Sequence, residues 1–335
     1  MKRRTVMSLA GGVALTALSA RALTPGRTYR IGWIGYTATN TAQDELALAA
    51  FRQRLRELGL VEGGNLLIIW RYAEGRLERY DDFAAEMVKL GVDLVIATSN
   101  VPAQAVMRVS RDMPIVHISA NDPVRAGLVA SLAHPGGQNT GILSLNIDLI
   151  PKRLELLKAA IPSTARVAIV RCVACAMSSG QNPASYAARY DGYMAAARGL
   201  GITLQLVDVS AATDFAAASA TLRRDRPDAL MILPTPTPTT VALRGQFVAL
   251  AAELRLPTFG SAARYGHFLS YGADWSAIMR WTADFVAHIL DGAKPGDLPM
   301  EQPTVFEFVI DLRIAKTLGL TIPQSVRLQA TEVIE

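Results

Sequence analysis

The sequence has few of the side chains that usually carry catalysis or bind metals. Only two of its 335 residues are cysteines and four are histidines. No G-x-S-x-G nucleophile elbow is present, and no G-x-G-x-x-G motif follows the first predicted strand. The histidines have no spacing typical of metal ligands, and they are His117, His134, His267 and His288. These absences predict a chain that is not an enzyme and that needs no metal and no cofactor.

Two further features are missing. The one glycine-rich loop, 136–141, continues with Ile142 and Leu143, whereas a phosphate loop continues with Lys and then Ser or Thr. After the first 22 residues no apolar run is long enough to cross a bilayer, which takes about 20 residues. The sequence therefore predicts neither a nucleotide-binding loop nor a membrane span in the mature chain.

Both cysteines lie in one short segment, Cys172-Val-Ala-Cys175, directly after an apolar stretch at 166–170. In an oxidising compartment such a pair is expected to form a local disulfide that stiffens a loop. Two free thiols and a redox-active pair are the alternatives, because the C-x-x-C spacing lowers a thiol pKa. Two cysteines without a second pair of ligands do not make a zinc site.

The first 22 residues predict an export signal. Lys2, Arg3 and Arg4 form a positive start, residues 5–20 carry no charge, and Ala20-Arg21-Ala22 fits a small-x-small cleavage site. The apolar part is too short and too weak for the alternative, a membrane anchor. We expect cleavage near Ala22 and a periplasmic location, and the paired arginines suggest the twin-arginine route as an alternative to the general secretory route.

Most of the formal positive net charge of the sequence comes from that segment. The formal net charge is +5, and removal of the four basic residues of the signal would leave about +1. The basic balance therefore predicts no nucleic-acid partner.

The remaining chain contains an internal repeat. Continuous apolar runs alternate with helical stretches, and the order in 29–116 recurs in 166–259. Continuous apolar runs are typical of parallel strands buried on both faces, and a repeat of this length predicts two similar lobes. The expected fold class is α/β, with two doubly wound parallel-sheet lobes joined by a multi-crossing hinge.

The repeat also predicts the division of the chain. Residues 1–22 are the signal peptide, 28–145 form lobe one, and 146–272 form lobe two. The helical stretch after residue 275 does not fit the repeat, so we expect about 275–300 to return to lobe one and about 301–335 to lobe two. Several crossings between lobes are typical of a hinge.

Polar side chains gather where the predicted strands end, which is where ligands bind in open α/β sheets. Helices begin directly after several of these ends, so their backbone N–H groups can meet an anionic group. Ser99, Asn121 and Thr235 have helix capping or turn formation as an alternative role, and so has Asp122. The predicted ligand-binding residues are Tyr36, Thr37, Ser99, Asn100, Asn121, Asp122, Thr235 and Tyr271.

Specific segments resemble one known family, the substrate-binding proteins of ABC transporters that include tryptophan- and tyrosine-binding members. The resemblance runs from about Arg30 to the C-terminus. It rests on early segments at 51–59, on Lys152 to Leu157, and on two motif-rich stretches. These are Asp122-Pro-Val124, Gly127-Leu-Val129, Ser131-Leu-Ala133, Pro135-Gly-Gly137 and Thr140-Gly141, then Ile289 to Gly292, Lys294-Pro295, Asp297-Leu-Pro299, Glu301-Gln-Pro303 and Ala315 to Leu320.

The resemblance implies a type I periplasmic-binding fold that closes on a small molecule and presents it to a membrane permease. We expect a monomer that captures a small ligand with an aromatic or carboxylate group. Amino-acid-binding relatives often carry an acidic residue where this chain has Pro234-Thr235. Because an ammonium group needs a carboxylate or several carbonyls, this departure argues against an amino acid as the ligand, with Asp122 as the alternative source of the negative charge. The alternatives are a sensory protein that reports to a membrane receptor, and an exported thiol-redox protein that uses Cys172 and Cys175.

Overall fold

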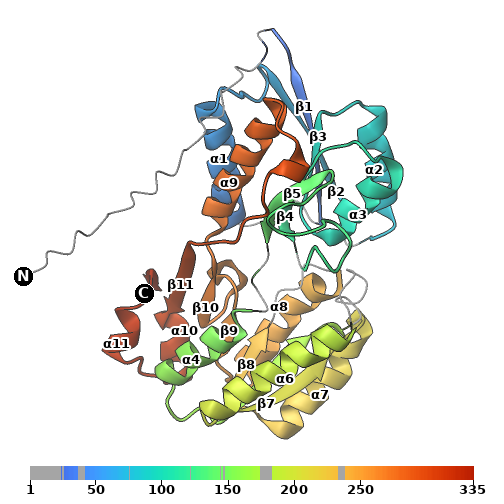
Figure 1. Cartoon of the computed structure of the whole chain (residues 1–335). Helices are drawn as coiled ribbons and strands as arrows, with labels where there is room; N and C mark the ends of the chain where they lie inside the picture. The colour runs from blue at the N-terminus through green and yellow to red at the C-terminus, as the bar shows by residue number, and fades with distance from the viewer. Residues whose placement is uncertain are drawn as a thin grey trace, which may run out of the picture.

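The computed structural model describes residues 24, 26–36, 42–74, 76–120, 122–143, 145, 148–173, 183–232 and 238–335. It consists of two α/β lobes, one above the other in Figure 1. The predicted signal peptide, Thr37, Asn121, Cys175 and Thr235 lie outside the described residues.

Lobe one is built on a five-stranded parallel sheet with the strand order β2-β1-β3-β4-β5. Its strands are β1 (Tyr29–Gly35), β2 (Leu66–Tyr72), β3 (Leu94–Ala97), β4 (Ile115–Ala120) and β5 (Asn139–Leu143). The helices between them are α1 (Ala42–Glu57), α2 (Arg79–Lys89) and α3 (Asn100–Val109).

Both faces of this sheet are covered. Alternate residues of β3 point to opposite faces, because side chains along a strand alternate. Leu94 and Ile96 pack with α1, and Val95 and Ala97 pack with α2 and α3. All four are fully buried, which explains the continuous apolar run in the sequence.

Lobe two contains a seven-stranded sheet with the order β12-β11-β10-β9-β8-β6-β7. Its strands are β6 (Arg166–Arg171), β7 (Thr203–Asp208), β8 (Ala229–Ile232), β9 (Thr258–Gly260), β10 (Leu269–Ala273), β11 (Phe306–Asp311) and β12 (Glu332–Ile334). Its helices are α4 (Ile150–Ala160), α6 (Pro183–Gly199), α7 (Phe215–Asp225), α8 (Pro238–Glu253), α10 (Leu312–Leu318) and α11 (Gln324–Arg327), and its 3-10 turns are η1 (Ala212–Asp214) and η2 (Ala263–Tyr265).

The two sheets repeat one topology. In lobe one the strands follow the order second, first, third, fourth, fifth, and β7-β6-β8-β9-β10 follow the same order in lobe two. The predicted α/β fold with two similar parallel-sheet lobes is thus confirmed. One feature differs from the prediction: β11 pairs antiparallel with β10, so the sheet of lobe two is mixed at that edge.

The chain returns to lobe one after β10. Helix α9 (Trp275–Leu290) packs against α1, and the two lie side by side in the upper lobe of Figure 1. Ile278, Met279 and Val286 of α9 are buried in the same apolar cluster as α1 and the sheet. Asp274 caps the helix, because its side chain accepts hydrogen bonds from the backbone N–H groups of residues 276 and 277.

The segment after α9 is fixed to lobe one by backbone contacts before it crosses to β11. It includes the turn η3 (Pro295–Asp297). Gly136 N–H donates to Gly296 O at 3.0 Å, and Glu301 N–H donates to Gly141 O at 2.8 Å. A Cβ on Gly296 would lie 2.7 Å from Gly137 N. The two motif-rich stretches that carry the family resemblance therefore contact each other, and their glycines permit the close approach.

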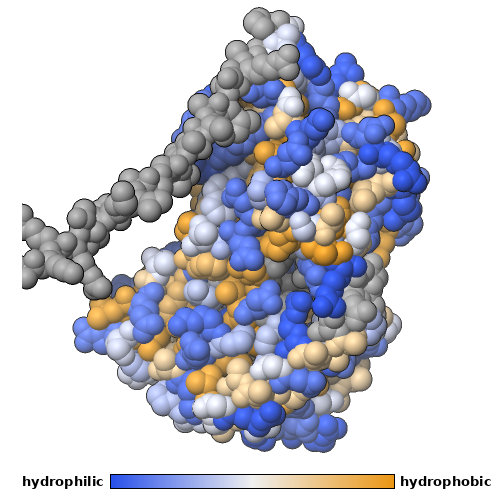
Figure 2. All heavy atoms as spheres, viewed as in Figure 1, coloured by the Kyte–Doolittle hydropathy of each residue, from blue (hydrophilic) through white to orange (hydrophobic). Residues whose placement is uncertain are grey.

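No helix in the described part of the chain is long and apolar enough to cross a membrane. On the face shown in Figure 2, hydrophilic and hydrophobic residues are interspersed over both lobes.

Candidate functional site

Four predicted site residues follow three neighbouring strands of lobe one. Tyr36 comes after β1, Ser99 and Asn100 come after β3, and Asp122 comes after β4. Because β1, β3 and β4 are adjacent and parallel, these residues share one edge of the sheet. We call them the lobe-one edge.

Tyr36 is a half-buried phenol beside the end of β2. Its backbone carbonyl accepts a hydrogen bond from Glu74 N–H at 2.8 Å. Burial, with a smaller contribution from the Glu74 carboxylate, raises the pKa of Tyr36 to about 12. The hydroxyl is therefore neutral at physiological pH and can both donate and accept a hydrogen bond.

Ser99 occupies the position before the first residue of α3, where a serine side chain usually caps the helix. It has an extended backbone, and its hydroxyl makes no capping hydrogen bond. The capping alternative is thus not the role of the Ser99 side chain in this structure. Asn100, the first helical residue, is 1% exposed. The partly exposed Ser99 lies beside the N-terminus of α3, whose N–H groups favour an anionic partner.

Asp122 has a left-handed backbone, with φ of 44°, a conformation that Asp tolerates better than most residues. One carboxylate oxygen lies 3.6 Å from Arg125 Nε and 3.7 Å from Arg189 Nη2. Arg125 belongs to lobe one, whereas Arg189 lies on α6 of lobe two. The Asp122–Arg189 pair therefore joins the lobe-one edge to lobe two, and we call this place the lobe junction.

Arg189 is a residue that the sequence did not single out. Its Nη1 lies 3.9 Å from Asp148, in the connection between the lobes. Burial raises the pKa of the Asp148 carboxyl, and Arg189 partly offsets this rise. The sequence feature that marks this part of α6 is a set of three tyrosines at helical spacing around Arg189: Tyr186, Tyr190 and Tyr193.

These tyrosines form a largely buried stack on α6. The rings of Tyr186 and Tyr190 lie 4.9 Å apart, and Tyr193 meets Tyr190 edge-on at 5.4 Å. The Arg171 guanidinium lies 4.4 Å from the centre of the Tyr190 ring and pairs with Asp208 at 2.5 Å. Burial raises the pKa of Tyr193, whose buried hydroxyl has no hydrogen-bond partner within the described part of the chain. These rings are buried in the core of lobe two, so the side chain that this lobe places against Asp122 is Arg189.

Tyr271, the predicted contact from β10, packs within its own lobe. Its ring stacks on Phe306 at 5.7 Å and meets Phe308 edge-on at 6.4 Å. Its backbone carbonyl accepts a 2.8 Å hydrogen bond from Nε of Arg153, which is fully buried. Burial lowers the pKa of Arg153 to about 10, so this side chain stays charged inside lobe two.

Cys172 follows β6 and is 1% exposed. It is disulfide-bonded, and Cys175, the other cysteine of the sequence, lies outside the described residues. Thr37, Asn121 and Thr235 are also predicted site residues that lie outside them, so their contacts with the junction stay predictions.

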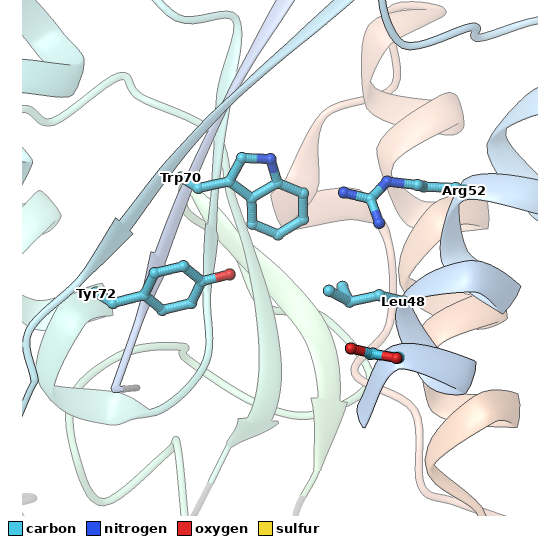
Figure 3. A pocket seen from close by; sticks show the side chains of 5 residues that line it. Leu48, Arg52, Trp70 and Tyr72 are labelled. Atoms are coloured by element: carbon cyan, nitrogen blue, oxygen red, sulfur yellow. The ribbon is translucent and has the colours of Figure 1, made fainter. Parts of the chain in front are cut away.

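A separate pocket of about 400 Å³ lies on lobe one between α1 and the edge strand β2. In Figure 3, Trp70 and Tyr72 of β2 point toward Leu48 and Arg52 of α1. The Arg52 guanidinium lies 5.4 Å from the centre of the Trp70 ring and pairs with Glu62 at 2.7 Å. None of the predicted site residues lines this pocket.

Known proteins resemble this chain over most of its length. It is 25% identical over 276 residues to the tyrosine-binding protein of Clostridioides difficile, covering 82% of this chain and 76% of that protein. A conserved domain protein from Vibrio cholerae is 26% identical with a TM-score of 0.77, over 92% of this chain and all of that one. An ABC domain from Streptococcus pneumoniae, solved in complex with L-Trp, has a TM-score of 0.78 at 24% identity and the same coverage.

The model of one protein family, ABC transporter substrate binding protein, matches residues 43–334. This match confirms the resemblance given by the motif-rich stretches, and it classes the chain as a binding protein and not an enzyme. The chain belongs to the family of ABC transporter substrate-binding proteins.

Proposed function

We propose that the protein is the extracytoplasmic solute-binding component of an ABC importer. It captures a small molecule between its two lobes and delivers it to a membrane permease. The observation that carries the proposal is the lobe junction, where Asp122 of the lobe-one edge lies 3.7 Å from Arg189 on α6 of lobe two. Family membership and the export signal expected in residues 1–22 support a periplasmic monomer.

The ligand is proposed to bear an aromatic or a carboxylate group. The tyrosine-binding relative and the structural neighbour solved with L-Trp support a ligand with such groups. Hydrogen bonds to the ligand come from the neutral Tyr36 phenol, from the Ser99 hydroxyl, which does not cap α3, and from the N-terminus of α3. Asn100 and Asp122 lie beside them. Thr37, Asn121, Thr235 and Tyr271 complete the proposed contacts.

The test is a thermal-shift screen of the chain from residue 23 onward against amino acids, aromatic acids and short carboxylates. A ligand that binds only the folded state stabilises it by about 2.7 kcal/mol at a hundred times its Kd, which raises the melting temperature. S99A and D122A should each weaken a hit, while S325A, an exposed change on α11, should not. If no compound raises the melting temperature, or if S99A and D122A bind a hit as wild type does, the proposed site is wrong.

A further inference from the structure

At the lobe junction two opposite charges face each other without a hydrogen bond. The Asp122 carboxylate and the Arg189 guanidinium are 3.7 Å apart, which is beyond hydrogen-bond distance. Their side chains are only 21% and 25% exposed. Charged groups withdrawn from water to this extent are costly unless they are hydrogen-bonded.

Most arginine–carboxylate pairs in the described part of the chain lie within hydrogen-bond distance, whereas the contacts of Asp122 with Arg189 and Arg125 do not. Arg171 holds Asp208 through hydrogen bonds of 2.5 and 3.2 Å, and Arg223 holds Glu253 through bonds of 2.6 and 2.7 Å. Arg189 has only its two long contacts, with Asp122 and Asp148, in the described part of the chain. Its planar set of five N–H donors, which suits a carboxylate bidentately, is therefore available.

The charges around the pair limit the kind of ligand. Asp122 and Asp148 are negative, and Arg125 and Arg189 are positive, so the four groups cancel. A ligand with only a carboxylate would satisfy Arg189 but would be repelled by Asp122. A ligand with only an ammonium group would leave Arg189 without a hydrogen-bonded partner. A zwitterion supplies a partner to each of the two facing groups.

We propose that Arg189 is the specificity-determining residue that binds the carboxylate of a zwitterionic ligand, while Asp122 binds its ammonium group. The proposal rests on the proposed function, since it assigns chemistry to the same inter-lobe site. It places the acidic partner of the ammonium group on lobe one.

The experiment is titration calorimetry with L-tyrosine and two trimmed probes. Tyramine lacks the carboxylate, and 3-(4-hydroxyphenyl)propionate lacks the ammonium group. R189Q should weaken L-tyrosine and the propionate by about 30-fold or more, and tyramine by less than about 3-fold. D122N should weaken L-tyrosine and tyramine by about 30-fold or more, and the propionate by less than about 3-fold. R189K, which keeps the charge but not the bidentate geometry, should lose less affinity than R189Q.

R198Q is the matched control, because Arg198 lies on the same helix as Arg189 but is exposed to solvent. It should leave the affinity for L-tyrosine within about 3-fold. Equal losses for all three probes in R189Q would indicate a structural role and overturn the proposal. Wild type that binds tyramine as tightly as L-tyrosine would overturn the proposal but leave the proposed function standing. No binding of any probe by wild type would overturn the proposal, and the thermal-shift screen would then decide the proposed function on its own.

Discussion

Lobe one and lobe two share a strand order but offer different side chains at their junction. Lobe one presents small polar groups on the loops after three adjacent strands, among them the Ser99 hydroxyl and the Asp122 carboxylate. Lobe two places Arg189 there, on a helix whose stacked tyrosines are buried in the core of that lobe. The duplicated topology therefore brings the two lobes together at the proposed site, and the side chains placed there differ between the lobes.

The lobes also differ in how their fifth strands approach the fourth. A Cβ on Gly141 of β5 would lie 2.1 Å from His117 O, and its φ of 134° is unfavourable for other residues. A Cβ on Gly272 of β10 would lie 2.1 Å from Ser261 O, without a positive φ. The two glycines thus permit similar contacts under different backbone constraints.

The largest predicted effect on stability is at Gly141, and it tests whether the two glycines differ. G141A should destabilise the protein by about 3 kcal/mol or more, because both the clash and the backbone strain must be relieved. G272A should cost less, since only the clash applies. G137A is the control, because a Cβ at Gly137 meets nothing within 4 Å. Urea unfolding measures all three, and an unchanged midpoint for G141A would show that β5 can move away from β4.

Acid should affect a buried histidine in each lobe. Burial lowers the pKa of His117 in lobe one to about 4 and that of His267 in lobe two to about 3. In the unfolded chain both titrate near 6.5, so below that pH the unfolded state binds protons that the folded state does not. Each histidine's contribution to stability is complete above pH 6.5 and is lost as pH falls, by at most about 1.4 kcal/mol per pH unit.

The two losses should end at different pH values, near 4 for His117 and near 3 for His267. Unfolding free energies from pH 7 to 3.5 for wild type, H117Q and H267Q would separate them. H117Q should flatten the pH dependence down to pH 4, while H267Q should flatten it over the whole range. If neither variant alters the slope, the buried imidazoles do not control acid stability.

The smallest effect concerns the ion pairs between α1 and α9 on the outside of lobe one. Arg54 contacts Asp284 at 2.8 Å, and Arg280 contacts Glu57 at 2.9 Å. Exposed pairs contribute little and are screened by salt. R54Q should shift the melting temperature by about 1 °C or less, with the difference vanishing at 1 M salt. A larger, salt-insensitive shift would mean that these pairs, and not the apolar cluster beneath, hold α9 to lobe one.

Much of the fold follows from sequence patterns. Runs such as Leu94 to Ala97 could be predicted as buried parallel strands because both faces need apolar residues. The antiparallel pairing of β11 with β10 could not, since it depends on where the chain re-enters lobe two after α9. His117 lies within β4 and is fully buried, as its place in an apolar run indicates.

Of the candidate site, only the grouping of the lobe-one residues could be predicted from the sequence. Residues after parallel strands meet at a common edge, so Tyr36, Ser99 and Asp122 could be grouped from their positions alone. Arg189 could not, because an arginine within a helix usually marks a solvated face. Its role near Asp122 arises from the packing of one lobe against the other, which no local pattern encodes.

The crossing of the chain between the lobes has a consequence for synthesis. Lobe one lacks α9 until residue 290 has been made, and lobe two lacks β11 and β12 until residues 306–334 have been made. Neither lobe can therefore complete its core while the ribosome is still translating the middle of the chain. The segments from α9 onward are therefore the part of the chain that completes both lobes.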